Sequence, residues 1–462
     1  MNKYIDLIEQ TFYFPTEDFE VKDDTLHFHG VDLNAIIQQY GTPLKLTYLP
    51  KISEKIQLAK KLFNDAIKEK NYEGTYTYCY CTKSSHFQFV LEEALKNDIH
   101  IETSSAYDIA IIKSLYAKKL ISKDTYVVCN GFKRPLYVEE ISSLLNAGFK
   151  NCIPVLDNMR ELEYYEQHVD QEFQLGLRVA SDEEPNFSFY TSRLGIRYNK
   201  IVDFYLDKIK GKSKGKLKML HYFINTGIKD TSYYWNELSR FVNKYCELKK
   251  VCPEIDSIDI GGGFPIKNSL HFEYDFAYMV DQIVEQIQSI CKEHDVPVPN
   301  IFTEFGSFTV GESGAALYSV LDQKLQNDKE LWYMMDGSFI THMPDVWGLN
   351  QKFIMLPVNA WKNDYHRVNI GGLTCDSMDY YDSEAHIAEV FLPKVKRDEP
   401  LYFGFFNTGA YQEALGGYGG IQHCLIPAPK HIIIEKDDDG KMISRVFAPE
   451  QNSEQMLKIL GY

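Results

Sequence analysis

The stretch Thr75-Tyr-Thr-Tyr-Cys-Tyr-Cys-Thr-Lys83 has the aromatic and β-branched composition of a β-strand, and it ends on a lysine. Similar short apolar segments recur as far as Val310, with helix-like segments between them. The strand-like segments are residues 76–81, 126–129, 152–155, 174–179, 217–222, 257–260 and 300–304. The helix-like segments include residues 87–96, 106–115 and 233–248. Strands that alternate with helices in this way predict a parallel sheet covered by helices.

Two α/β architectures fit this alternation, a closed (β/α)8 barrel and an open doubly wound sheet. Polar and glycine-rich residues lie where the strands end, and charged residues lie on the helices. A barrel builds its ligand site from such strand ends. A doubly wound dinucleotide fold would carry a Gly-x-Gly-x-x-Gly turn after its first strand, and the sequence has none there. We therefore predict a (β/α)8 barrel over residues 43–315.

The later segments predict a second, all-β domain over residues 316–462. Short β-type runs follow one another there, and glycine and proline separate them. The runs are residues 316–320, 331–335, 353–358, 388–392, 401–406 and 430–434. Residues 1–42 contain one strand-like piece, 26–28, and we expect this N-terminal segment to pack against the β domain.

The composition indicates a soluble globular protein that binds neither nucleic acid nor membranes. The 462 residues carry a net charge of −16, which disfavours both polyanions as partners. Residues 1–20 have charges within their apolar stretch and no small-residue cleavage site, so we expect no signal peptide. No apolar run approaches the roughly 18 residues of a membrane helix. The nine cysteines include no Cys-x-x-Cys pair, which favours reduced thiols, a cytoplasmic location and no metal site.

Lys83 is the first candidate for chemistry. Its apolar and aromatic neighbours on the strand predict a desolvated amine with a lowered pKa, as attack on an aldehyde requires. The alternative is a solvated surface lysine, which is what most lysines are. The place of Lys83 at the end of a predicted barrel strand favours the first interpretation.

The segment Asp259-Ile-Gly-Gly-Gly-Phe-Pro265 predicts an anion-binding loop after another strand. Because Gly261, Gly262 and Gly263 have no side chains, their backbone N–H groups can approach an oxyanion closely. The alternative is a flexible turn. Three consecutive glycines directly after Ile-Asp-Ile are unusual, which keeps the anion-binding interpretation open.

Three further segments place polar side chains at turns. Glu304 closes a strand, where its carboxylate can pair with a ring nitrogen. Cys375 and Asp376 lie in a turn-like stretch of the second domain, where a thiol can donate a proton and an acid can hold a cation. Tyr411 begins another turn and can bind phosphate. Each also has an ordinary interpretation, as a solvated carboxylate, an incidental surface cysteine or a packed tyrosine.

Taken in order, these groups fit the three requirements of pyridoxal 5'-phosphate (PLP). The cofactor needs an amine for its aldehyde, backbone N–H groups for its phosphate and a carboxylate for its ring nitrogen. Lys83, the glycine triplet and Glu304 offer these groups in turn. We therefore predict a PLP site built from the ends of barrel strands.

Nearly the whole chain, from Tyr40 to Ile434, resembles the PLP-dependent decarboxylases of the alanine-racemase-like barrel type. That family acts on ornithine, arginine, lysine and diaminopimelate. The resemblance rests on CTKSS (81–85), IETSSAYD (101–108), IDIGGGFP (258–265), GGLTCDSMD (371–379) and GAYQEALGG (409–417). Within the family, CNGFK (129–133) and MPDVWGLNQKFIMLP (343–357) look like the arginine decarboxylases of polyamine biosynthesis.

The resemblance implies how the cofactor is held. Lys83 binds PLP covalently, and Glu304 pairs with the pyridinium nitrogen. Tyr411 joins the glycine triplet in binding the phosphate. Three departures from the family pattern matter. Phe223 stands where the family stacks a histidine on the cofactor ring, Ser307 replaces a phosphate-binding arginine, and Asn225-Thr226 replaces a small glycine-serine pair. Thr226 can still bond phosphate and Phe223 can still stack, but the loss of the arginine removes a full positive charge.

The resemblance also implies how the substrate is held. Asp336 and Asp376 receive the distal cation, and Cys375 returns a proton to the substrate carbon that has lost CO2. Cys375 and Asp376 reach into the site of a partner subunit, so a homodimer with shared active sites is implied.

The expected activity is PLP-dependent decarboxylation of a basic amino acid, with L-arginine to agmatine and CO2 as the favoured reaction. Ornithine, lysine and diaminopimelate are alternative substrates, because guanidinium and ammonium groups both bind carboxylates. An inactive PLP-binding homologue is the alternative from another class. The three departures would allow it, but the presence of Lys83, Glu304 and Cys375 argues against it.

Overall fold

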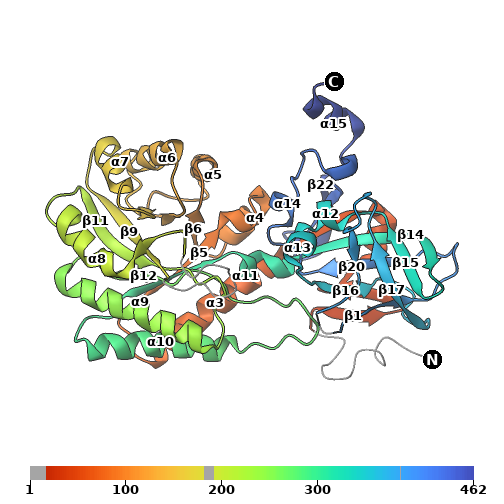
Figure 1. Ribbon diagram of the computed structural model, residues 1–462, viewed down its shortest axis with the longest axis horizontal. Coiled ribbons are helices and arrows are strands. Elements are labelled where there is room, and N and C mark those ends of the chain that lie inside the picture. Colours follow the sequence, from red (N-terminus) through yellow and green to blue (C-terminus); the bar gives the residue numbers. More distant parts are fainter. Residues whose placement is uncertain (1–16, 182–191, 386) are drawn as a thin grey trace. The chain divides into compact units, whose positions relative to one another are not determined.

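The computed structural model describes residues 17–181, 192–385 and 387–462 (Figure 1). Residues 1–16, which make up most of the segment considered for a signal peptide, lie outside the described residues. The chain forms two compact units. The barrel unit comprises Ser53–Pro265 and Tyr274–Thr309, and the sheet unit comprises Met1–Ile52, Ile266–Glu273 and Val310–Tyr462.

The barrel unit contains eight parallel strands that close on themselves, as predicted. Their order is β9-β11-β12-β13-β5-β6-β7-β8, and the pairing of β8 with β9 closes the ring. The strands are β5 (Tyr76–Cys81), β6 (His100–Thr103), β7 (Val127–Cys129), β8 (Cys152–Leu156), β9 (Phe173–Ala180), β11 (Gly215–His221), β12 (Ser257–Asp259) and β13 (Asn300–Phe305). A two-residue strand, β10 (Ile196–Arg197), pairs with β9 outside the ring.

Helices surround this ring (Figure 1). They are α3 (Pro50–Glu69), α4 (Gln88–Leu95), α5 (Ala106–Ala117), α6 (Pro135–Asn146), α7 (Glu161–His168), α8 (Tyr198–Phe204), α9 (Ser232–Val251) and α10 (Phe276–Glu293). The strands also contribute a buried apolar cluster that includes Cys79, Val128, Ile153, Met219 and Phe302. Because this cluster fills space between strands, the polar chemistry of the unit is left to the strand ends.

The sheet unit is built on a ten-stranded mixed sheet and a small three-stranded sheet. The large sheet contains β4 (Leu44–Tyr48), β14 (Gly314–Gln326), β15 (Glu330–Met335), β16 (Ile354–Pro357), β17 (Tyr365–Gly371), β18 (Tyr380–Tyr381), β19 (Val390–Pro393), β20 (Tyr402–Phe406), β21 (Lys430–Lys436) and β22 (Met442–Ala448). The small sheet contains β1 (Phe19–Lys22), β2 (Thr25–Phe28) and β3 (Val31–Asp32). Phe19 and Phe28 share a buried cluster with Phe406 and Ile432, so the N-terminal strands pack on the large sheet.

Short helices complete the description. In the sheet unit they are α2 (Leu33–Tyr40), α12 (Phe339–His342), α13 (Pro344–Leu349), α14 (Gln412–Leu415) and α15 (Ser453–Leu460), while α11 spans Ser307–Val310. Across the three described ranges, no helix combines the length and the apolar character that a membrane span needs.

The first boundary of the barrel lies later than the predicted residue 43. Strand β4 was expected to enter the barrel, but it pairs with β14 and β21 in the mixed sheet. Lys430 lies opposite Leu44 in that pairing, so the partner strand is far away in the sequence. A five-residue apolar strand carries no sign of which sheet it will join, because the choice depends on distant partners.

Candidate active site

Lys83 lies in a single 3-10 turn (Thr82–Ser84) directly after β5. Its Nζ donates to Oε2 of Glu102, at the end of β6, over 2.6 Å. The side chain of Lys83 is 41% exposed, whereas the carboxylate of Glu102 is fully buried. The amine therefore stays accessible to a ligand although it is held against a buried acid.

This ion pair corrects the expected pKa of Lys83. Burial opposes the charge on the amine, but Cys81 and the carboxylates of Glu102 and Glu304 outweigh burial and hold the pKa of the amine well above its usual value. The sequence shows the apolar neighbours on β5, whereas the compensating acids come from other strands. A lowered pKa was therefore the wrong prediction for this amine.

Glu304 on β13 lies at the centre of a buried hydrogen-bond network. Nδ2 of Asn130 donates to Oε1 of Glu304 over 2.5 Å and to Oε1 of Glu102 over 3.2 Å. Nε2 of His221 lies 3.2 Å from the other oxygen of Glu304. We name these five residues, Lys83, Glu102, Asn130, His221 and Glu304, the barrel cluster.

The barrel cluster keeps Glu304 ionised. Burial raises the pKa of this carboxyl, but His221, Asp259 and Lys83 outweigh burial and hold its pKa well below the usual range. For Asp259, burial and the neighbouring Glu304 raise the pKa well above its usual value. One of the two neighbouring acids is therefore charged and the other neutral, which is the arrangement that close carboxyl groups favour.

The glycine triplet follows β12 and closely approaches the backbone of β13 and of the loop after β11. A Cβ atom on Gly262 would lie 2.1 Å from the carbonyl oxygen of Glu304, and one on Gly263 would lie 2.7 Å from Cα of Gly227. Gly261 and Gly263 also have φ values of 68° and 110°, which side chains disfavour. No other residue is accommodated there without a shift of the backbone.

The N–H groups of the triplet are not equivalent. Gly261 donates its N–H to Oδ1 of Asp259 over 2.8 Å, so that group is already occupied. Among the described residues, no acceptor is found for the N–H groups of Gly262 and Gly263. Two of the three predicted phosphate donors therefore remain available to an anion.

Thr226 and Phe223 follow β11, on the loop that Gly227 brings against the triplet. The hydroxyl oxygen of Thr226 is buried and has no hydrogen-bond partner within the described residues. Such an atom loses hydrogen-bonding energy unless a ligand supplies a partner. Phe223 is 44% exposed, and the guanidinium carbon of Arg178 lies 5.9 Å from the centre of its ring.

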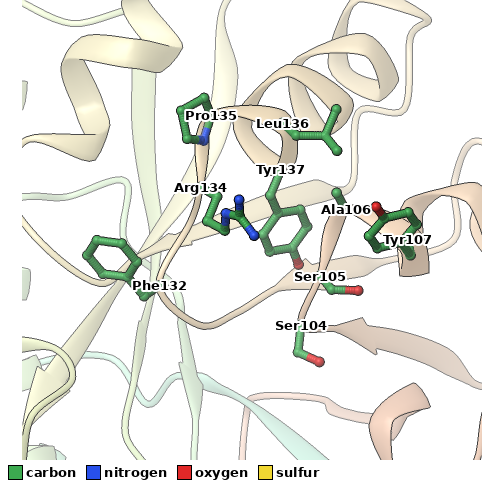
Figure 2. A pocket seen from close by; sticks show the side chains of 9 residues that line it. All are labelled: Ser104, Ser105, Ala106, Tyr107, Phe132, Arg134, Pro135, Leu136 and Tyr137. Carbon is green, nitrogen blue, oxygen red and sulfur yellow. The ribbon is translucent and has the colours of Figure 1, made fainter.

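A pocket of about 410 Å³ lies on the loops that follow β6 and β7 (Figure 2). Its lining includes Ser104, Ser105, Tyr107, Phe132 and Arg134. Glu102 lies near the end of β6, and Asn130 directly follows β7. The pocket is therefore lined by residues that follow these two members of the barrel cluster in the chain. The lining contains one cationic side chain and no carboxylate, so this pocket would not hold the distal cation of a basic substrate.

Cys375 and Asp376 lie on an exposed loop of the sheet unit, between β17 and β18. We name residues 372–379 the cysteine loop. Its anchor is Asp379, whose Oδ2 accepts from the N–H and the hydroxyl of Thr374 over 3.0 and 2.6 Å. The other oxygen accepts from the N–H of Phe339 over 2.7 Å. The buried acid fixes the loop while its tip stays in solvent.

Asp336 and Tyr411 also lie in the sheet unit. The carboxylate of Asp336 accepts from the N–H and the hydroxyl of Ser319 over 2.9 and 2.7 Å, and burial raises its pKa. Tyr411 has a φ of 67° at the N-terminus of α14, a conformation that non-glycine residues adopt rarely. The preceding Gly409 is required there, because a Cβ would lie 2.1 Å from the carbonyl oxygen of Val310.

The structure thus groups some of the predicted residues and leaves others in a separate unit. Lys83, Glu304 and the glycine triplet share the barrel unit, whereas Cys375, Asp376, Asp336 and Tyr411 belong to the sheet unit. Sequence analysis assigned no role to Glu102, Asn130 or His221. Asn130 and His221 could have been found, because Asn130 directly follows the predicted strand 126–129 and His221 lies near the end of the predicted strand 217–222.

These features define the class of protein. The model of the family "Pyridoxal-dependent decarboxylase, pyridoxal binding domain" matches residues 49–311, which is more than half of the chain. The chain therefore belongs to the pyridoxal-dependent decarboxylases, and the predicted family, fold class and cofactor are confirmed.

Relatives within this family extend the likeness over nearly the full length. The chain is 21% identical to the biosynthetic arginine decarboxylase of Shewanella frigidimarina (strain NCIMB 400), covering 93% of this chain and 87% of that protein. It is 22% identical to arginine decarboxylase 2 of Arabidopsis thaliana, covering 95% and 77%.

Solved structures show the same fold. The biosynthetic arginine decarboxylase of Campylobacter jejuni superimposes with a TM-score of 0.79 at 19% identity, covering 97% of this chain and 89% of that one. Diaminopimelate decarboxylase from M. jannaschii gives a TM-score of 0.78 at 18% identity, covering 96% and 98%.

The residues of the barrel unit fit PLP. An exposed amine at Lys83, two available N–H groups at the triplet and the orphaned hydroxyl of Thr226 match the aldehyde and the phosphate. The ionised Glu304 matches a protonated ring nitrogen.

Proposed function

We propose that this protein decarboxylates L-arginine to agmatine and CO2. The observation that carries the proposal is the buried Glu304, which Asn130 and His221 hold in the barrel cluster of a chain that resembles arginine decarboxylases over nearly its whole length. The environment of Glu304 supports the reaction type, and the resemblance to arginine decarboxylases supports the substrate.

When bound, PLP supplies an electron-withdrawing ring that accepts the electron pair released as CO2 leaves the α-carbon. The residues of this chain prepare that step. Glu304, kept ionised by His221 and Asp259, holds a proton on the ring nitrogen. Asn130 keeps the carboxylates of Glu102 and Glu304 in place by donating to both.

Lys83 must first be held in position as a cation and must then lose its proton to bind PLP. Glu102 holds the amine as a cation in the ligand-free chain, which positions it near the place of attachment. Covalent attachment to the PLP aldehyde requires the neutral amine, so the proton of Lys83 must leave first. The buried carboxylate of Glu102 is the nearest acceptor for that proton.

The sheet unit supplies the proton and the substrate contacts in this proposal. Cys375 donates its thiol proton to the α-carbon after CO2 leaves, and Asp376 binds the distal guanidinium. Both act in the site of a partner subunit, so the working form is a homodimer with shared sites in the cytoplasm. The exposure of the cysteine loop in the single chain supports this, because a proton donor must be covered from water to act selectively.

A second substrate is favoured by one observation. The pocket of Figure 2 contains Arg134 and no acid, a lining that suits a distal carboxylate such as that of diaminopimelate.

One assay separates the candidates. Purified protein with PLP is incubated with each basic amino acid and with diaminopimelate, and CO2 and the amine product are measured. We expect the highest kcat/KM for L-arginine. Turnover of diaminopimelate that falls in an Arg134→Gln variant would replace arginine as the substrate, and a bound-PLP absorbance band without turnover of any amino acid would indicate an inactive homologue.

A further inference from the structure

A second set of reactive side chains lies away from the barrel cluster, on the surface of the sheet unit. Cys375 comes from the cysteine loop, and His423 and Cys424 begin a 3-10 turn (His423–Leu425). One ligand atom from each of the three residues lies within 4.8 Å of the other two, and all three residues are exposed. The two sulfur atoms are 3.4 Å apart.

We propose that Cys375, His423 and Cys424 bind a thiophilic divalent cation, with zinc as the best fit. Thiolate and imidazole are the donors that zinc prefers in proteins. Zinc–sulfur bonds of about 2.3 Å at the tetrahedral angle place two sulfurs about 3.8 Å apart. The observed separation therefore needs only a small outward shift for both thiolates to bind one ion.

The site is built from two segments that are fixed independently. Asp379 anchors the cysteine loop through its bonds to Thr374 and Phe339. The other segment is held by the side chain of Gln422, which donates to the carbonyl oxygen of Gly416 over 3.1 Å. Because both segments are ordered before any ion arrives, little conformational entropy remains to be lost on binding.

Sequence analysis predicted no metal site, because no close pair of cysteines carries zinc spacing. Cys375 and Cys424 are 49 residues apart, and only folding brings them together. The other seven cysteines are all buried. The sulfur atoms lie 3.9 Å apart in two pairs of these, Cys129 with Cys152 and Cys246 with Cys291. Within the described residues, neither pair has a third histidine, cysteine or acidic ligand nearby.

Three protein ligands leave a fourth position on a tetrahedral ion open to water. Binding requires both thiols as thiolates, so it releases their protons. An ion at this site would therefore remove the thiol proton that the proposed function assigns to Cys375. The expected inhibition rests on that function, whereas the binding itself does not.

Cobalt(II) reports on this site directly, because it occupies tetrahedral zinc sites and gives visible bands. The reduced holoenzyme is titrated anaerobically with Co2+, and difference spectra are recorded against the metal-free holoenzyme. We expect intense tetrahedral d–d bands and a thiolate-to-cobalt charge-transfer band, saturating at one ion per chain. Addition of one equivalent of Zn2+ should abolish both.

Two variants and one control assign the ligands. Cys424→Ser should halve the charge-transfer intensity per bound ion, because one thiolate remains. His423→Asn should keep the charge transfer but weaken binding more than about tenfold, since even the loss of a ligand's outer-shell partner costs about 10–100-fold. His168→Asn, at an exposed histidine on α7, should leave the titration unchanged.

The absence of tetrahedral bands would overturn the proposal, and so would bands that persist unchanged in Cys424→Ser. A count of reactive thiols in the metal-free protein that is two lower than expected would also overturn it, because it would indicate a disulfide. Inhibition by Zn2+ is measured in the same preparations. It is expressed as the ratio of the decarboxylation rates with and without the ion. If no amino acid is turned over but the cobalt bands behave as expected, the proposed function fails and the metal site stands.

Discussion

The barrel cluster and the cysteine loop hold their reactive groups in opposite ways. Glu304 is buried and bonded to side chains from two other strands, whereas Cys375 lies at the exposed tip of a loop anchored from below by Asp379. The first arrangement fixes charge before a ligand arrives, as electrostatic catalysis requires. The second leaves a thiol in water, where it cannot act alone. The barrel unit thus contains a prepared cofactor site, and the sheet unit contains parts that need a covering surface.

The largest effect should come from Lys83→Ala, which removes the amine of the barrel cluster. We expect loss of measurable turnover and loss of the absorbance band of bound PLP, because the variant lacks the amine at the end of β5 that would bind the aldehyde covalently. Lys113→Ala, which removes an exposed ion pair with Glu140 on the outer helices, serves as the matched control. Full activity in Lys83→Ala would end the PLP assignment at this residue.

Glu304→Gln should be the next most severe change. It preserves the shape of the side chain but removes the charge that His221 and Asp259 maintain. Removal of one preorganised electrostatic contact costs about 100–1,000-fold in kcat. We expect a loss of that size, with the PLP band retained although shifted. A kcat within a few fold of wild type would show that the low pKa of Glu304 does not serve the reaction.

Asp376→Asn tests whether the cysteine loop becomes covered. In a pocket shielded from water, a charge-assisted hydrogen bond contributes about 1.5–3 kcal/mol. The variant should then lower kcat/KM for arginine by about ten- to a hundredfold and leave PLP affinity unchanged. An exposed pair contributes only about 0–1 kcal/mol, so an unchanged kcat/KM in a fully dimeric sample would remove Asp376 from the substrate site. Asp382→Asn, at an exposed acid directly after β18, is the control.

Glu102→Gln should change the pH dependence of cofactor capture. Glu102 contributes to the raised pKa of Lys83, and only the neutral amine attacks the aldehyde. Loss of the carboxylate lowers that pKa, so the neutral fraction at a given pH increases. The rate at which apoenzyme gains the PLP band should rise severalfold near neutral pH, and its pH profile should move to lower pH. A shift to higher pH would contradict the role given to Glu102, and Glu92→Gln on α4 is the matched control.

The sequence predicted the barrel and most of the cofactor site because these depend on local patterns. The alternation of strands and helices indicated the parallel barrel, and Lys83 and the glycine triplet lie next to strand ends. The interactions that it missed cross between strands. Nothing near Glu304 in the sequence indicates that Asn130 and His221 will bond to it, and nothing near Leu44 indicates that β4 pairs with β21.

The same limit explains the pKa of Lys83. Desolvation by residues on its own strand was visible, but Glu102 lies on a neighbouring strand, and its carboxylate outweighs burial. The cysteine loop shows the same limit. The sequence shows a thiol next to a carboxylate, but it does not show what surrounds them in the folded protein. Asp376 was expected to bind the distal cation in a site shared with a partner subunit, and within its own chain it is exposed.

The last prediction asks whether a partner subunit supplies that shielding. Lys83→Ala and Cys375→Ala proteins, each inactive alone, are mixed under conditions where subunits exchange. Random exchange makes half of the dimers mixed, and each mixed dimer has one site with both residues intact, so activity should approach about a quarter of wild type. Exchange is verified with subunits that carry distinguishable tags, and mixing each variant with itself is the control. If exchange is complete and no activity returns, Lys83 and Cys375 act within one chain, and the exposed cysteine loop must then be covered by its own subunit.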